Sequence, residues 1–392
     1  MSVARPSVKG IVFCNSAIAY NGVILLTPVN GTGVWLIDMH GNYIHYWEMG
    51  YAPGCYGELL PNGNLLYAGK VEQAPLCDME GAGGILLEVD WDCNIVWQYE
   101  DAYLHHAFYR MKNGNTLVLK WVKVPKEIAA KVKGGDPGSE RNGEMWGDAI
   151  QEITPEGEVA WEWIAHEHLD PEVDVSCPVC PRSDWTHANA CVELSDGNIL
   201  TCFMKNNSLA IIDKKSGDIK WRWGPIELAH PHSPSVLDNG NILVFDNGLH
   251  QRGINSANSR VLEVNPESSE IVWYYKEDTN MRFYSSTMSS CQRLPNGNTF
   301  ICEGTTGRLF EVTPKGELVW EYVNNLPSYE PAALKSKHCA VYSAYRYGID
   351  YSGLRRPIPL PAESQSAPGT VSPAMVPTKE ETLRTRLQRL GY

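Results

Sequence analysis

Hydrophobic and polar residues alternate along the chain in short runs that end at turn residues. One recurring element consists of two alternating runs that are joined by Asp, Asn, Pro or Gly and close on tryptophan. An alternation with a period of two places successive side chains on opposite faces of a strand, so each copy predicts a β-hairpin. The copies lie at residues 35–48, 86–100, 150–163, 209–223, 261–275 and 309–322.

A second hairpin precedes each of these, and most copies turn at Asn-Gly or Asp-Gly, as in ELLPNGNLLYAG. We expect type I′ turns, because both central residues of that turn need a positive φ, which Asn and Gly adopt readily. The copies lie at residues 19–26, 58–69, 109–120, 192–203, 235–248 and 292–304.

Two hairpins make a four-stranded unit, and the repetition predicts an all-β fold, a six-bladed β-propeller. The closing tryptophans recur roughly every 50 residues, as propeller blades do. We expect them to pack between blades. They are Trp47, Trp97, Trp161, Trp221, Trp273 and Trp320.

The propeller is predicted over residues 1–357, with loop excursions that include 121–148, 166–185 and 246–260. Loops of this length usually carry function, so we expect them at the mouth of the central channel, with a short helix in KEIAAKVK. A Pro/Ser linker follows at 358–377. A short helix is predicted in the C-terminal tail, 378–392. Three placements of this tail are open: it docks on the propeller, it contacts a neighbouring subunit in a homo-oligomer, or it stays in solvent. The blades are expected at about 16–49, 53–101, 104–165, 185–225, 230–278 and 287–324, followed by a segment packed on the body, 336–357.

The net charge of the 392-residue chain is −13, which disfavours nucleic acid and anionic membranes as partners. The first residues lack the pattern of a secretory leader, and no apolar run is long enough for a membrane span. Eleven scattered cysteines fit small buried side chains in a reducing compartment, so we expect a cytoplasmic location. The close pair Cys177 and Cys180 is half a zinc site or a redox pair, and no second CxxC or HxxxH completes it.

Histidines recur at equivalent positions of the predicted innermost strands. Counted back from the first residue of the turn, His106 and His232 stand seven residues earlier, and His187 and His230 stand nine earlier. Odd offsets share one face of a strand. We therefore predict that His106, His187 and His232 converge at one end of the axis, with His230 as a further candidate, whereas His105 points to the opposite face.

Such a cluster supports several kinds of chemistry. Imidazoles act as general acids, general bases, nucleophiles or metal ligands, and an arginine such as Arg252 in the same pocket would bind an anionic group. The residues alone leave open whether a cofactor is present. A histidine-bound metal ion, if there is one, is assigned to His106, His187, His232 and His338.

Four stretches resemble the arylsulfotransferase family: DMHGNYIHYWE, DWTHANACVEL, HSPSVLDNGNILVFDNG with a following arginine, and DKKSGDIKWRWGP. The resemblance covers all six predicted blades and is densest at residues 184–275. It implies a six-bladed propeller that moves a sulfuryl group from a phenolic sulfate ester to another phenol without a nucleotide donor. It also implies a transiently sulfated histidine.

The resemblance implies catalytic roles for His187, His232 and Arg252, the last as an anion clamp. The family has a further histidine, which takes the sulfuryl group, but the corresponding strand here, FYSSTMSSCQRLPNGN, has none. The nucleophile is then expected to be His338 or His106. The residues assigned to substrate binding are Asn189, His230, His250 and Tyr284.

Three functions remain open. The first is an arylsulfotransferase-like enzyme that acts on a small aromatic or phenolic anionic substrate in the central channel. The second is a divergent lyase, hydratase, isomerase or oxidoreductase on the same propeller, whose histidines either hold a metal ion or act as general acid and base. The third is a binding propeller without catalysis.

Overall fold

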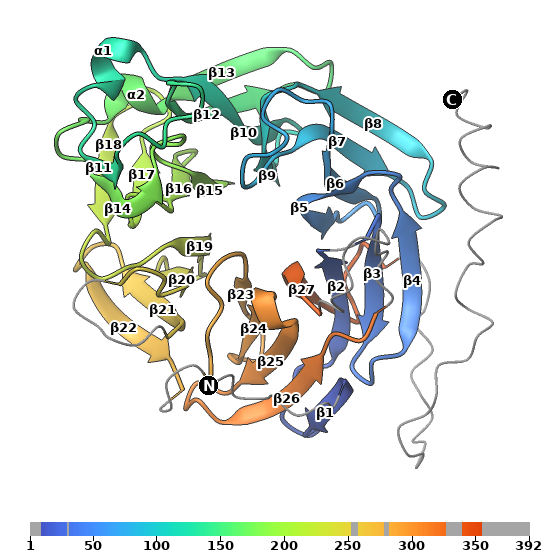
Figure 1. Cartoon of the computed structure of the whole chain (residues 1–392). Coiled ribbons are helices and arrows are strands. Elements are labelled where there is room, and N and C mark those ends of the chain that lie inside the picture. Colours follow the sequence, from blue (N-terminus) through green and yellow to red (C-terminus); the bar gives the residue numbers. More distant parts are fainter. Residues whose placement is uncertain (1–8, 30, 252–257, 278–281, 327–338, 355–392) are drawn as a thin grey trace.

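The computed structural model describes residues 9–29, 31–251, 258–277, 282–326 and 339–354. It shows six antiparallel blades arranged around a central axis (Figure 1). The predicted six-bladed β-propeller is therefore confirmed. The predicted linker and C-terminal tail lie outside the described residues.

Blades 2 to 5 each take four strands from one stretch of chain, in order from the axis outward. Blade 2 holds β5 (Ala52–Leu59), β6 (Leu65–Lys70), β7 (Gly84–Val89) and β8 (Ile95–Glu100); blade 3 holds β9 (Leu104–Arg110), β10 (Thr116–Lys123), β12 (Trp146–Ile153) and β13 (Val159–Ile164). Blade 4 holds β15 (Ala188–Glu193), β16 (Ile199–Phe203), β17 (Ser208–Ile212) and β18 (Ile219–Trp223); blade 5 holds β19 (Pro231–Val236), β20 (Ile242–Asp246), β21 (Arg260–Asn265) and β22 (Glu270–Tyr275).

Blades 1 and 6 are completed from both ends of the chain. Blade 1 consists of β27 (Val341–Gly348), β2 (Gly22–Pro28), β3 (Gly33–Asp38) and β4 (Tyr43–Glu48), so its innermost strand comes from the segment expected to pack on the body. Blade 6 consists of β23 (Ser290–Arg293), β24 (Thr299–Glu303), β25 (Arg308–Val312) and β26 (Leu318–Val323), with β1 (Gly10–Cys14) added outside β26. The ring is thus closed by strand pairing from both ends.

The closing tryptophans join neighbouring blades, as predicted. Each indole N–H donates a hydrogen bond to the next blade around the ring, which satisfies its polar atom while the ring fills the gap between the sheets. The acceptors are the carbonyl oxygens of Asp90, Pro155, Lys214, Pro314 and Met39 for Trp47, Trp97, Trp161, Trp273 and Trp320, and the Ser269 hydroxyl for Trp221.

In blades 2 to 6 the inner hairpins form where the Asn-Gly and Asp-Gly signals predict them, but the expected type I′ turn is wrong. The hairpin predicted at Asn21-Gly22 does not form, because β27 supplies the innermost strand of blade 1. In blade 2 only Gly63 has a positive φ, 85°, and Asn62 does not. Leu60 pairs with Asn64 across a three-residue loop, which is a type I turn followed by a left-handed glycine. The Asn62 side chain accepts the N–H of Asn64 at 2.9 Å, so the asparagine holds the turn by a side-chain hydrogen bond.

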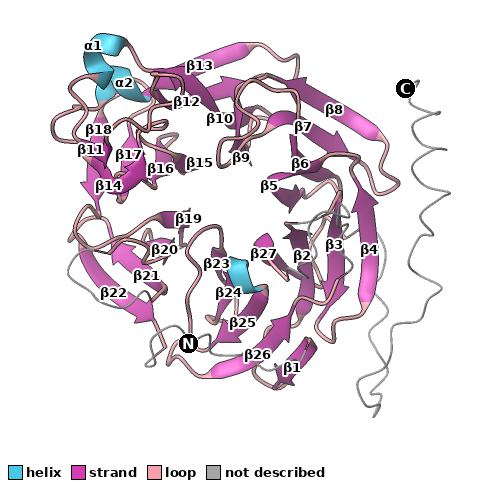
Figure 2. Cartoon of the chain, in the orientation of Figure 1, coloured by secondary structure: helices cyan, strands magenta, loops and turns pink. Residues whose placement is uncertain are grey.

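The helices among the described residues are short: α1 (Lys126–Ala129) in the first excursion, α2 (Ala165–His168) at the start of the second, and the 3₁₀ turn η1 (Gly304–Thr306) between β24 and β25 (Figure 2). The short helix expected in KEIAAKVK is confirmed as α1. β11 (Gly134–Asp136) pairs in parallel with β14 (Ser176–Pro181), which joins the first two excursions. No helix among the described residues is long and apolar enough to span a bilayer. All eleven cysteines are free thiols, with no disulfide between them.

Candidate functional site

A cavity of about 380 Å³ lies on the axis and is bordered by the innermost strands of blades 1 to 5 and by residues 287–289, which lead into β23 of blade 6. The residues seven positions before the inner turns all line it: Cys55, His106, Asn189, His232 and Ser289. Of the residues two positions earlier, Pro53, His187 and Thr287 also line it. The structure therefore brings His106, His187, His232 and Asn189 together at one level of the propeller.

The inner strands lose their regular register at the level of the cavity. On β15 the pairing with β16 shifts between Ala188 and Ala190, and on β19 it shifts between His232 and Ser235. Such bulges bend a strand and redirect its side chains. As a result, side chains on both faces of an inner strand can turn toward the axis.

The bulge in β9 brings His105 to the histidine cluster. The expectation that His105 points away from the cluster is therefore wrong. Three residues of β9 between Leu104 and Phe108 lie opposite a single residue of β10, so the alternation of faces breaks there. The His105 ring lies 4.4 Å from the His106 ring and 4.8 Å from the His187 ring, measured between centroids. Both His105 nitrogens are buried without a hydrogen-bond partner among the described residues.

His187 is held by a buried carboxylate. Its Nδ1 donates to Asp184 Oδ2 at 2.6 Å, and both side chains are 3% exposed. Burial alone would lower the pKa of His187, but the charge and hydrogen bond of Asp184 outweigh it and raise that pKa. Burial opposes ionisation of Asp184 as well, yet Lys205, 3.7 Å away, and His187 lower its pKa to about 2.

His232 is held in one tautomer. Its Nδ1 donates to Asn247 Oδ1 at 2.7 Å and to the His230 carbonyl oxygen at 3.1 Å, which leaves Nε2 with the lone pair of the neutral ring. The Asn247 amide nitrogen in turn donates to the Ser285 carbonyl oxygen at 2.8 Å. Burial lowers the pKa of His232 to about 4, and burial together with the neighbouring histidines lowers the pKa of His106 well below its usual value.

The cavity also contains charged and aromatic side chains that the sequence pattern does not single out. Glu80, from the loop between β6 and β7, accepts a hydrogen bond from Thr287 Oγ1 at 3.0 Å. Burial would raise the pKa of Glu80, but His187 and Thr287 lower it. Lys70, Tyr342 and Tyr345 also line the cavity. Of the residues missed, Asp184 alone lies in a recognisable motif, the DWTHANACVEL stretch.

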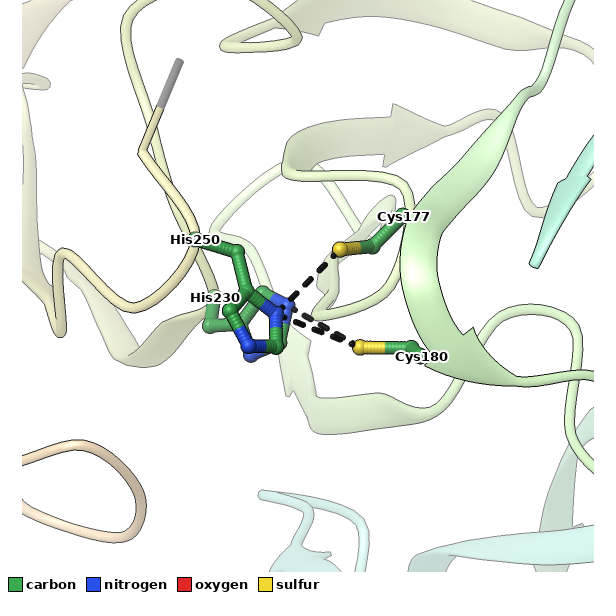
Figure 3. A group of neighbouring side chains, drawn as sticks. All are labelled: Cys177, Cys180, His230 and His250. Atoms are coloured by element: carbon green, nitrogen blue, oxygen red, sulfur yellow. Dashed lines mark hydrogen bonds between the residues drawn. The ribbon is translucent and has the colours of Figure 1, made fainter. Parts of the chain in front are cut away.

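Other residues assigned from the sequence do not line the axial cavity. His230 and His250 instead lie beside Cys177 and Cys180, which form a second group (Figure 3). Tyr284 is half-buried and is not part of the cavity wall. Arg252 and His338 lie outside the described residues.

Solved structures resemble the chain at low sequence identity. A protein of unknown function from Bacteroides caccae superposes with a TM-score of 0.52 and 14% identity, covering 83% of this chain and 98% of its own. A virginiamycin B lyase from Staphylococcus aureus gives 0.43 and 12%, covering 80% and 87%. A functionally unknown protein from Desulfotomaculum acetoxidans gives 0.46 and 10%, covering 83% and 99%. Likeness at such identities concerns the fold alone, and no curated protein matches the chain.

The sequence family is clearer. The model of the arylsulfotransferase (ASST) family matches residues 60–325, which is more than half of the 392-residue chain. The matched region runs from the inner hairpin of blade 2 to the end of blade 6 and contains Asp184, His187 and His232. With the predicted propeller present and its axial histidines in one cavity, the match over this length shows that the chain belongs to the arylsulfotransferase family.

Proposed function

We propose that the chain transfers a sulfuryl group between small phenolic compounds in the axial cavity. The observation that carries this proposal is the placement of the Asp184-bound His187 beside His106 and His232, all three of them buried side chains, in the wall of one cavity. A volume of about 380 Å³ suits a single aromatic ring with an anionic substituent. Tyr56, Phe108 and other rings of the wall would contact the aromatic part.

The first half of the reaction would place the sulfuryl group on a histidine. A neutral imidazole nitrogen attacks sulfur, the N–S bond forms, and the bond from sulfur to the phenolic oxygen breaks with its electron pair on that oxygen. His187 is protonated before this step, and the Asp184 carboxylate stabilises that imidazolium. His187 gives its proton to the leaving phenolic oxygen and becomes neutral. A second phenol then returns the proton to His187 and takes the sulfuryl group by the reverse steps.

The chain offers two described histidines as the attacking group. His232 has its Nδ1 engaged by Asn247, so its Nε2 carries the lone pair, and His106 lines the same cavity. Sulfuryl transfer places negative charge on the sulfuryl oxygens, and cations that are already in position lower the barrier. Lys70 is a described cation in the wall, and the resemblance adds Arg252 as an anion clamp.

The first test is whether the release of p-nitrophenol from p-nitrophenyl sulfate depends on a phenol acceptor. In the second, the chain is incubated with the donor but no acceptor, the reaction is quenched, and the peptides are analysed by mass spectrometry. We expect a sulfated histidine at position 106 or 232, and a loss of activity of roughly a hundredfold or more in His187→Ala. The exposed turn residue His40 provides the matched control, since His40→Ala should leave the activity unchanged. The absence of both turnover and a sulfated peptide would contradict the proposal.

One observation favours a second candidate, a divergent metal-dependent enzyme. Ligand atoms of His105, His106 and His187 lie within 4.8 Å of one another, and three imidazoles suit zinc, iron or copper. The group differs from the one expected from sequence, because it contains His105 and does not contain His232. Elemental analysis separates the two candidates: a metal that is lost in His105→Ala, together with no sulfuryl transfer, would favour this second function.

A further inference from the structure

We propose that Cys177, Cys180, His230 and His250 form a zinc site, separate from the axial cavity, that fastens the excursion between blades 3 and 4 to blade 5. In Figure 3 the two sulfur atoms and the two imidazoles converge on one another from opposite sides. One ligand atom from each residue lies within 4.8 Å of all the others. Two cysteines and two histidines are an established ligand set for structural zinc.

The distances match those expected around one tetrahedral ion. Cys177 Sγ lies 3.4 Å from His250 Nδ1, and Cys180 Sγ lies 3.5 Å from His230 Nε2 and 3.6 Å from His250 Nδ1. With Zn–S near 2.3 Å and Zn–N near 2.0–2.1 Å, a sulfur and a nitrogen on one tetrahedron are about 3.6 Å apart. The two rings are nearly perpendicular, at 83°, so they do not stack. Each ring places one nitrogen within 3.6 Å of a sulfur atom.

The surroundings suit a structural ion. Cys177, Cys180 and His230 are between 2% and 5% exposed, whereas His250 lies at the surface and gives an ion a route of entry. Two thiolates would balance the charge of Zn²⁺, so the filled group would be electrically neutral. Four ligands would complete the coordination of zinc and leave no open position for a substrate, which is typical of a structural site.

Hydrogen bonds outside the group hold its three segments in place. The Cys177 N–H, on β14, donates to the Lys205 carbonyl oxygen at 2.7 Å, and the His230 N–H donates to Asn207 Oδ1 at 2.9 Å. The loop that carries His250 is tied at its start, where the Gly248 N–H donates to the Ala229 carbonyl oxygen at 2.9 Å. The ligand geometry is therefore set by the backbone before any ion binds, which lowers the entropy cost of binding.

The same geometry argues against a redox pair as the role of Cys177 and Cys180. A disulfide would use both sulfur atoms and give no reason for two imidazole nitrogens to approach them. Here each sulfur has a histidine nitrogen within 3.6 Å, and those histidines come 50 and 70 residues after Cys180. That separation also explains why the CxxC looks incomplete in the sequence.

The first test is the metal content of the purified full chain, prepared without chelator. We expect one zinc per chain, and a loss of at least about tenfold in zinc retained after dialysis for Cys180→Ser and for His250→Ala. Cys93→Ser, in a turn of blade 2, and His40→Ala, in a turn of blade 1, are matched controls that should retain zinc. His106→Ala should retain it too, which distinguishes this site from the axial histidines.

The second test needs no variant and so does not depend on the folding of one. The zinc is removed with a chelator and replaced by Co²⁺. We expect the intense visible bands of a tetrahedral cobalt site together with a sulfur-to-cobalt charge-transfer band, which a site of histidines alone would lack. Three outcomes would overturn the proposal. They are iron or copper in place of zinc, a wild-type chain that neither contains nor takes up zinc, and a Cys177–Cys180 disulfide found by mass spectrometry.

Discussion

At the scale of single residues, unusual backbone conformations collect around the two sites. Eleven described residues other than glycine have a positive φ, a conformation that costs roughly 1–3 kcal/mol each unless the surroundings hold it. Seven of them lie at the sites: Cys55, His187, Ser233, Met288 and Ser289 line the axial cavity, and His230 and His250 belong to the cysteine–histidine group. The fold therefore sustains local strain where side chains must face one another.

Glu58 gives a residue-scale prediction about pH. This half-buried carboxyl lies on β5, where burial raises its pKa to about 7 and nearby Arg110 only partly opposes the shift. The folded chain then holds a proton that the unfolded chain releases above about pH 4.5, so this residue makes folding less favourable as the pH rises from about 4.5 to 7. Urea unfolding of wild type and Glu58→Gln across this range measures the effect.

We expect the variant to lack that part of the pH dependence. Between pH 4 and pH 8, the unfolding free energy of the variant minus that of wild type should increase by no more than about 3 kcal/mol. Two parallel stability curves would show that Glu58 ionises normally in the folded chain.

At the scale of elements, charged groups link blades 2, 3, 5 and 6 to the blade that follows each of them. In these four blades a Glu on the third strand accepts hydrogen bonds from Asn side chains of its own inner turn and pairs with a cation of the following blade. Glu88 accepts a hydrogen bond from Asn64 Nδ2 at 2.7 Å and forms an ion pair with Arg110 Nη2 at 2.8 Å. Glu311 of blade 6 likewise receives Asn298 and pairs with Arg346 of β27. The Asn-Gly-Asn repeat therefore shapes the turns and also positions the seams between blades.

The seam between blades 6 and 1 gives a prediction at this scale. Arg346 and Glu311 are 0% exposed, and the guanidinium also lies over the rings of Phe300 and Trp320. Arg346→Met should lower the unfolding free energy by about 3–5 kcal/mol, because it leaves the Glu311 carboxylate buried and unpaired. Urea unfolding measures the loss.

Two comparisons make this test specific. Arg346→Met combined with Glu311→Gln should lose less than the single variant, since no unpaired charge then remains buried. Arg141→Ala removes a surface pair with Asp78 and should cost no more than about 1 kcal/mol. Equal losses in the single and double variants would mean that the buried charge does not determine the stability of the seam.

At the scale of the whole molecule, the ring depends on a strand from the far end of the chain. β27 pairs along β2 from Gly348 opposite Gly22 to Val341 opposite Pro28, and Val341 and Ala344 are fully buried. Without β27, the inner edge of β2 would expose its backbone donors and acceptors beside the channel. The ring is therefore closed by β27, which follows blade 6 in the chain and pairs with β2 of blade 1.

Truncation tests this role of β27. Compared with a chain that ends at Leu354, a chain that ends at Ala340 should unfold at a temperature lower by at least roughly 10 °C and should self-associate, because β2 becomes an open edge. Thermal unfolding and light scattering are the measurements. Added peptide 339–354 should restore part of the stability, whereas equal unfolding temperatures of the two chains would rule out closure by β27.

The sequence alone determines the blades and the axial level of His106, His187 and His232, because alternation, turn glycines and closing tryptophans are local signals that repeat. It also carries the family motifs. Only the tertiary structure decides three further features. A bulge turns His105 to the cluster, β27 reaches blade 1 from the far end of the chain, and two distant histidines meet Cys177 and Cys180. Local patterns could not predict these features, because each depends on contacts between separated segments, which form only when the ring closes.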